Sequence, residues 1–181
     1  MSPSASALVI ALVGIAGTLA SALLTQRSAN HNKLRELERA DQQRLEDRAY
    51  QAQQAVLEAR RSCYVALNIA ARLYQTELTN YLATIIAGNV TDELRTSVDE
   101  MRREHRSRHA EAQMVVPDSV LEKAGAVNGN LSQFYGILKA IDAGTATPSD
   151  TVEAAESRRL RSWDLLGEMR AAMRHDLDIA S

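Results

Sequence analysis

A helical seam between positions 49 and 73 constrains this chain more than any other feature. Its members follow one another in alternating steps of three and four residues. They are Ala49, Ala52, Val56, Ala59, Cys63, Ala66, Ala70 and Leu73. Heptad spacing keeps one stripe of a helix turned toward a partner helix, and small side chains let that partner come close. We therefore expect a long helix that packs against other helices.

The composition fits one modest domain plus an anchor. The chain has 181 residues, of which 45% are hydrophobic and 24% are charged. Its formal net charge of −2 provides no broad basic field that would attract nucleic acid. The single cysteine excludes an intramolecular disulfide, and a free thiol fits a reducing compartment.

Residues 5–24 carry no charge and read ASALVIALVGIAGTLASALL. About 20 apolar residues suffice to cross a bilayer as a helix, so we expect a transmembrane anchor over residues 1–25. The alternative is a cleaved signal peptide, which requires a basic start that residues 1–5 lack. Basic residues follow the span, among them Arg27, Lys33 and Arg35, which predicts an outside N-terminus and a cytoplasmic remainder at the cell membrane.

Small residues also form a stripe within the predicted span, and small residues let membrane helices approach closely. The stripe consists of Ala7, Ala11, Gly14, Thr18 and Ser21. It favours self-association in the membrane, although alanine-rich spans also show such stripes by chance.

Residues 26–48 alternate basic and acidic side chains with few apolar ones. No Gly or Pro occurs between Ser28 and Ala87, so nothing in the sequence stops a helix there. We interpret residues 26–48 as a charged helical stalk. A solvated, partly frayed linker is the alternative.

Residues 49–181 carry four helical patterns, separated by residues that commonly end or begin helices. Gly88 is expected to end the first helix and Thr91 to cap the second. Pro117 stops the second and suits the start of the third, which Gly144 ends. The Thr147-Pro148-Ser149-Asp150 run predicts the start of the fourth helix. Short connections between helices predict an all-α, up-down antiparallel four-helix bundle.

Each predicted helix carries an apolar stripe for the core. On the first helix a second stripe lies beside the opening seam, with Tyr64, Leu67, Tyr74, Leu78 and Tyr81 among its members. The stripe of the fourth helix is Val152, Ala155, Trp163, Leu166, Met169, Met173 and Leu177. Helices that are apolar on two sides usually lie inside a bundle.

The third helix carries a face of small residues, namely Gly125, Gly129, Ser132 and Gly136. Glycine costs about 1 kcal/mol relative to alanine in a helix, so three on one face predict close packing against another helix. A break at Asn128-Gly129-Asn130 is the alternative, because Asn-Gly is a turn signal. We favour a continuous helix, since the heptad stays in phase across it.

The predicted helix lengths do not match. At 1.5 Å per residue, a fourth helix of about 30 residues returns only to about residue 58. The lower seam then has no partner within its own bundle, and a second copy of the chain is its simplest partner. This oligomer seam is Leu45, Ala49, Ala52, Val56 and Ala59.

Motifs for catalysis or cofactors are missing from the sequence, so we expect neither an enzyme nor a cofactor. His105 and His109 are spaced to face one metal ion, but no third ligand is evident, and surface histidines are the default interpretation. Cys63 lies in the apolar seam, which favours an inert buried thiol.

A local basic cluster lies on the second predicted helix. It consists of Arg102, Arg103, Arg106 and Arg108. Acidic residues are as numerous on the same helix, so pairing within the helix is the default interpretation, and contact with anionic lipid is the alternative.

Residues 60–82, RRSCYVALNIAARLYQTELTNYL, together with residues 110–128, AEAQMVVPDSVLEKAGAVN, resemble small actinobacterial proteins that have an N-terminal span, a charged helix and a helical domain. Their function is mostly unassigned, so the resemblance implies an architecture and no site residues. Our first hypothesis is a membrane-anchored scaffold or adaptor that self-associates and binds a protein partner. The alternatives are a helical ligand-binding or sensor module, with ligand beside the glycine face, and an exported protein with a cleaved leader.

Overall fold

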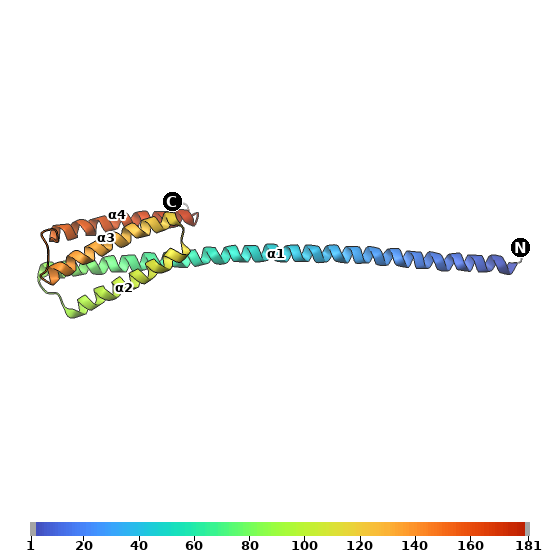
Figure 1. Cartoon of the computed structure of the whole chain (residues 1–181), viewed down its shortest axis with the longest axis horizontal. Helices are drawn as coiled ribbons and strands as arrows, with labels where there is room; N and C mark the ends of the chain where they lie inside the picture. Colours follow the sequence, from blue (N-terminus) through green and yellow to red (C-terminus); the bar gives the residue numbers. More distant parts are fainter. Residues whose placement is uncertain (1–2, 180–181) are drawn as a thin grey trace. The chain divides into compact units, whose positions relative to one another are not determined.

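The computed structural model describes the backbone of residues 3–179 and the side chains of residues 21, 26, 33, 36, 37 and 39–179. Within these residues the chain is all-helical, with four α-helices and no strand. They are α1 (Pro3–Ala87), α2 (Asp92–Val115), α3 (Asp118–Asp142) and α4 (Val152–Asp176) (Figure 1). The predicted fold class is therefore confirmed at the level of a helical bundle.

The chain divides into two compact units, Met1–Gln54 and Ala55–Ser181. In the first unit, all described side chains from residue 41 to residue 54 are exposed. Opposite charges pair along the helix, as between Arg44 Nη1 and Asp41 Oδ1 at 3.7 Å. An exposed, charged helical surface is what the alternation of residues 26–48 predicts.

The predicted membrane span lies outside the described side chains, apart from Ser21, which is exposed. The stripe residues Ala7, Ala11, Gly14 and Thr18 are likewise outside them. Among the side chains that are described, no helix is both long enough and apolar enough to cross a membrane.

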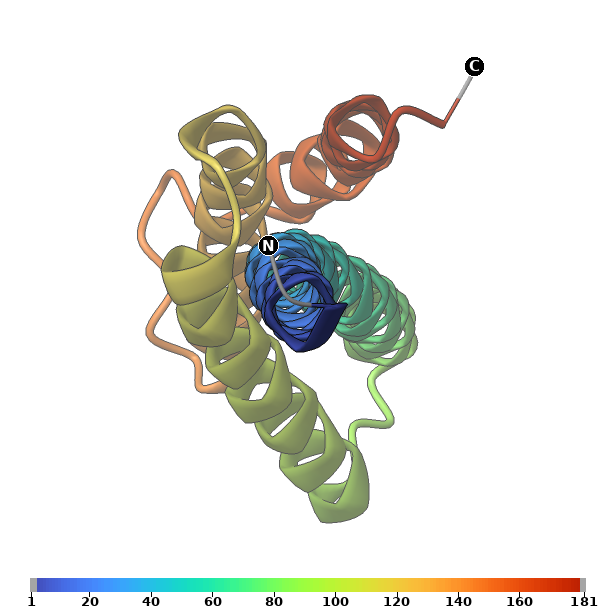
Figure 2. The ribbon, with the colours of Figure 1, turned by 90° about the vertical axis from the view of Figure 1, so that its right-hand side faces the viewer.

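In the second unit, residues 55–87 of α1 and helices α2, α3 and α4 alternate in direction along the chain (Figure 1). Viewed end-on, α2 lies obliquely to α3 and α4 (Figure 2). The largest fully buried side chains come from all four helices and include Tyr74, Tyr81, Phe134, Leu131 and Leu166. The core of α1 is the second stripe, since Tyr64, Leu67, Tyr74, Leu78 and Tyr81 are all buried.

The predicted turn chemistry is confirmed at four of the five predicted helix ends and starts. Gly88 and Gly144, just after α1 and α3, have φ of +67°, which glycine adopts without a steric penalty. The Thr91 hydroxyl caps α2 by accepting a hydrogen bond from the Leu94 N–H at 3.2 Å. Pro117 occupies the N-cap of α3, with φ of −70°.

The prediction for the start of α4 is wrong. The N-cap is Thr151, whose hydroxyl accepts a hydrogen bond from the Ala154 N–H at 3.1 Å. Thr147 and Asp150 instead form a local turn, in which Asp150 Oδ2 accepts hydrogen bonds from the Thr147 N–H at 2.9 Å and the Thr147 hydroxyl at 2.6 Å. An Asx-type side chain that can satisfy nearby backbone groups serves equally well in a turn or a cap.

Two further predictions concern α3 and α4. Helix α3 continues through Asn128-Gly129-Asn130, as the heptad phase predicts. Trp163, by contrast, was expected in the core but its side chain is 52% exposed, and Ser162 and Leu165 are buried in its place. The rest of the predicted stripe faces the core, because Ala155, Leu166, Met169 and Met173 are buried.

Candidate functional site

All five residues of the oligomer seam are exposed in the single chain. The largest, Leu45 and Val56, are 60% and 53% exposed. Along α1 the first buried residue among the described side chains is Cys63. The helix therefore carries an uncovered apolar stripe up to the point where the bundle core begins.

The end of α4 explains where that core begins. The Tyr64 hydroxyl donates a hydrogen bond of 2.6 Å to Asp176 Oδ2, and Arg60 Nη1 lies 3.7 Å from the same oxygen. Asp176 is the last residue of α4. The fourth helix thus ends beside Arg60, close to the position that its length predicts.

The glycine face of α3 does not pack against a helix of the described chain. Gly125, Gly129, Ser132 and Gly136 are all exposed. A Cβ atom placed on any of the three glycines would have no neighbouring atom within 4 Å. The expectation of close helix packing at these residues is therefore not met within the single chain, because α3 turns its opposite face, including Phe134 and Leu138, into the core.

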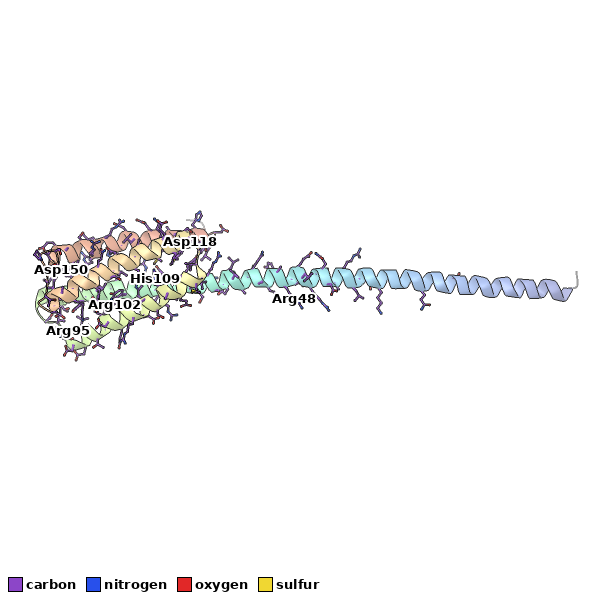
Figure 3. All side chains as sticks on the ribbon, viewed as in Figure 1. Arg48, Arg95, Arg102, His109, Asp118 and Asp150 are labelled. Atoms are coloured by element: carbon purple, nitrogen blue, oxygen red, sulfur yellow. The ribbon has the colours of Figure 1, made fainter. Side chains whose placement is uncertain are left out.

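A cavity of about 440 Å³ opens between α2 and α3. Its lining residues are Thr96, Asp99, Arg102, Arg103, Arg106 and Tyr135. All but Tyr135 come from one face of α2, where steps of three and four residues bring them together. Figure 3 marks the position of Arg102 on this helix.

The arginines of the basic cluster fall into two groups. Arg108 pairs within the helix, because its Nε lies 2.8 Å from Glu104 and its Nη1 lies 3.1 Å from Glu111. Arg103 Nη2 lies 4.0 Å from Glu100. The default interpretation of pairing within the helix thus holds for these two residues.

Arg102 and Arg106 form the second group. Neither makes an ion pair with another residue of the described chain. The Arg102 guanidinium stacks 4.3 Å above the centre of the Tyr135 ring, and its buried Nε has no hydrogen-bond partner among the described residues. This stacking holds the planar group beside the cavity without neutralising its charge.

Asp99 is the only carboxylate among the residues that line this cavity. Its oxygens are already engaged, because Oδ1 accepts a 2.8 Å hydrogen bond from the Tyr135 hydroxyl and Oδ2 lies 3.7 Å from Lys139 Nζ. Lys139 also lies 5.8 Å from the Tyr135 ring centre. The cavity therefore carries a net positive charge.

Buried polar side chains lie between α1 and α2 behind the cavity. The ring centres of Tyr74 and His105 are 5.6 Å apart, and those of His105 and His109 are 6.4 Å apart. Both the Tyr74 hydroxyl and His109 Nε2 are buried without a hydrogen-bond partner among the described residues. The surface position expected of the histidines is wrong for His105, which is fully buried on the apolar stripe of α2.

Burial controls the ionisation of these groups. Loss of hydration and, to a smaller extent, the nearby His109 together lower the pKa of His105 to about 4. Burial also lowers the pKa of His109 and raises the pKa of the Tyr74 phenol. His105 is therefore neutral at physiological pH.

Cys63 is buried in the core, as the sequence predicts, and burial is the main cause that raises the pKa of its thiol. In the described part of the chain, no group of three or more His, Cys, Asp or Glu side chains is arranged to hold a metal ion. A shallow depression of about 330 Å³ also touches the glycine face at Gly136, where it is bordered by Asp150 and Arg158.

The sequence contains a signal for the positive charge of this cavity. Counting the charges of the whole helix together hides that signal. Arg106 has Arg102 and Arg103 one turn before it and His109 and Ala110 one turn after it, so no acid is in reach along the helix. Arg108, by contrast, has Glu104 and Glu111 at those spacings. Testing each arginine separately would have singled out Arg106.

Comparisons with protein-family models, with curated proteins and with solved structures gave no match. The resemblance to small actinobacterial membrane proteins stays a prediction.

Proposed function

We propose that this protein is a non-enzymatic scaffold or adaptor, anchored in the cell membrane by residues 5–24, that self-associates through the oligomer seam. The N-terminus lies outside and the bundle, which binds a protein partner, lies in the cytoplasm. The uncharged run at residues 5–24 and the basic residues that follow it support the anchor and its orientation. In this proposal the protein uses no cofactor and binds no nucleic acid.

The exposed seam is the observation that carries this proposal. Leu45, Ala49, Ala52, Val56 and Ala59 keep heptad spacing and are all exposed, although heptad stripes are usually buried against a second helix. Helix α4 ends at Asp176, beside Arg60, and no other described helix of the chain covers the seam. A second copy supplies a helix with the same spacing and the same small side chains.

Disulfide cross-linking of the full chain in its native membrane tests self-association. The natural Cys63 is unsuitable because it is only 4% exposed. We therefore place a cysteine at the seam with Ala52→Cys, in a Cys63→Ser background. Mild oxidation is expected to give a covalent dimer in high yield, because identical seam residues of two parallel helices face each other.

The matched control is Gln54→Cys in the same background. Both positions are exposed, but two residues along a helix correspond to about 200°, so residue 54 lies on the opposite face. The control is expected to cross-link poorly. Equal yields at the two positions, or no dimer at either, would contradict self-association through this seam.

Mass measurement of the mature protein tests the anchor. An intact terminus at Met1 or Ser2 supports an uncleaved span, whereas loss of residues 1–25 supports the alternative of an exported protein. Labelling of Gln54→Cys with an impermeant thiol reagent in sealed cells then tests orientation. A cytoplasmic bundle predicts labelling only after the membrane is opened.

A ligand-binding or sensor module is the second candidate function. The cavity between α2 and α3 favours it, because three arginines line it and two of them, Arg102 and Arg106, make no ion pair with another described residue. The glycine face, where such a ligand was first expected, offers only the shallow depression at Gly136.

A further inference from the structure

We propose that the cavity between α2 and α3 is a binding site for a multiply charged oxyanion, with the phosphate group as its chemical class. The site is separate from the oligomer seam and does not depend on self-association. Its ligand is held by the guanidinium groups of Arg102 and Arg106, which line the cavity.

The first argument is charge. Three guanidinium groups line the cavity, against the single carboxylate of Asp99, which Tyr135 and Lys139 already engage. Like charges gathered on one face of a helix repel one another, which costs stability unless an anion offsets them. Arg103 is paired with Glu100, so the unpaired positive charge belongs to Arg102 and Arg106, in a chain whose net charge is −2. An anion therefore binds here with favourable electrostatics.

The second argument is the arrangement of the arginines. The Arg102 guanidinium stacks 4.3 Å above the centre of the Tyr135 ring, which orients the planar group beside the cavity and leaves its charge in place. Neither Arg102 nor Arg106 makes an ion pair with another described residue.

Guanidinium groups only donate hydrogen bonds, which determines the chemistry of the ligand. A phosphate oxygen accepts from a guanidinium in a planar, two-point arrangement. A phosphate group also carries enough charge to match Arg102 and Arg106 together. A volume of about 440 Å³ accommodates a phosphate group together with part of the molecule that carries it.

Phosphate titration of the full chain in detergent micelles tests the proposal. Inorganic phosphate is added at constant ionic strength, with chloride as the reference, and binding is measured by calorimetry and by the rise in Tm that a native-state ligand produces. The unmodified chain is expected to bind phosphate. Arg102→Gln and Arg106→Gln are each expected to weaken binding by about tenfold or more, because each removes a charged hydrogen bond.

Arg108→Gln is the matched control. It removes the same charge from the same helix, but Arg108 pairs with Glu104 and Glu111 and does not line the cavity. It is expected to change phosphate binding by less than about twofold. An equal loss in Arg106→Gln and Arg108→Gln would mean attraction by overall charge, and would overturn the site.

A second arm identifies the source of the phosphate group. The full chain is placed in bilayers of phosphatidylcholine alone or with phosphatidate, and the Tm is measured with and without inorganic phosphate. A rise with inorganic phosphate in the neutral bilayer indicates a soluble ligand, and a rise only with phosphatidate indicates a lipid headgroup. Either supports the site if Arg106→Gln abolishes it. No rise in either bilayer, or binding of an acidic peptide without binding of phosphate, overturns the proposal.

Discussion

The Tyr81 hydroxyl donates a hydrogen bond of 2.6 Å to Asp142 Oδ2, which ties the C-terminal end of the α1 core stripe to the last residue of α3. Arg95 of α2 donates two hydrogen bonds to the same carboxylate, from Nε to Oδ2 at 2.7 Å and from Nη2 to Oδ1 at 2.9 Å. Three helices therefore meet at one carboxylate. The Arg95 hydrogen bonds are the main reason that the pKa of Asp142 falls to about 2.

Asp142→Asn is expected to destabilise the bundle by about 2 kcal/mol at neutral pH, because Arg95 loses its part-buried carboxylate partner and keeps only the exposed Asp92. Urea unfolding followed by the tyrosine signal in the near-ultraviolet measures the change. Asp164→Asn is the control, since its exposed pair with Arg161 at 3.7 Å contributes little. Equal effects of the two substitutions would contradict this role of Asp142.

Acidification is expected to weaken the bundle through His105. Its pKa is about 4 in the folded chain and about 6.5 when unfolded, so the unfolded state binds more protons between these values. Stability therefore falls as the pH decreases from about 6.5 to about 4, by roughly 3 kcal/mol in total, and His105 adds no further loss below that.

Unfolding at a series of pH values checks this dependence. His105→Leu is expected to remove most of the slope between pH 6.5 and pH 4, whereas His175→Leu, at an exposed position of α4, leaves it in place. Protonation of Asp142 destabilises only at lower pH, because its pKa is about 2. A slope that persists in His105→Leu would contradict the assignment.

Gly129→Ala is expected to stabilise the bundle by about 1 kcal/mol. A Cβ at Gly129 meets no atom within 4 Å, so the substitution causes no clash. Its effect on stability comes from the higher helix propensity of alanine and the lower entropy of the unfolded chain. Thermal unfolding measures the change. Gly144→Ala is the contrasting control, because its φ of +67° strains any other residue and predicts destabilisation. A destabilising Gly129→Ala would reveal a contact made by another chain.

Val56→Glu is expected to separate self-association from folding. Val56 is 53% exposed and lies before the first buried residue of α1, so the bundle loses no internal contact. A charged side chain in a heptad seam strongly weakens association, because the charge must lose its hydration when it packs against a second helix. We expect an unchanged Tm of the bundle together with loss of the cross-linked dimer in the Ala52→Cys background. A large drop in Tm would place Val56 in the bundle core.

Sequence reasoning predicted the helices of the bundle well, because their signals are local. Gly88, Thr91 and Gly144 act through the conformation of their own residues and their neighbours in the chain. The apolar stripe of α1 also predicts which residues are buried, because Tyr64, Leu67 and Leu78 occupy one face of the helix.

The failures arose where two helices decide the outcome. Trp163 is one position off the buried face of α4, where Ser162 lies instead. Asn130 of α3 donates hydrogen bonds there to Ser162 Oγ at 2.9 Å and to the Arg158 carbonyl at 3.0 Å. The cavity was hidden for the same reason. Its positive charge depends on Asp99 being engaged by Tyr135 and Lys139 of α3, which no spacing within α2 reveals.

The position of Cys63 makes its thiol a natural probe for local opening of the bundle core. It is the single cysteine of the chain, it is the first buried residue along the described part of α1, and burial raises the pKa of its thiol. A thiol reagent reacts with it only in molecules whose core has opened beside the end of α4. The labelling rate under native conditions therefore yields the free energy of that local opening, separately from the free energy of unfolding the whole bundle.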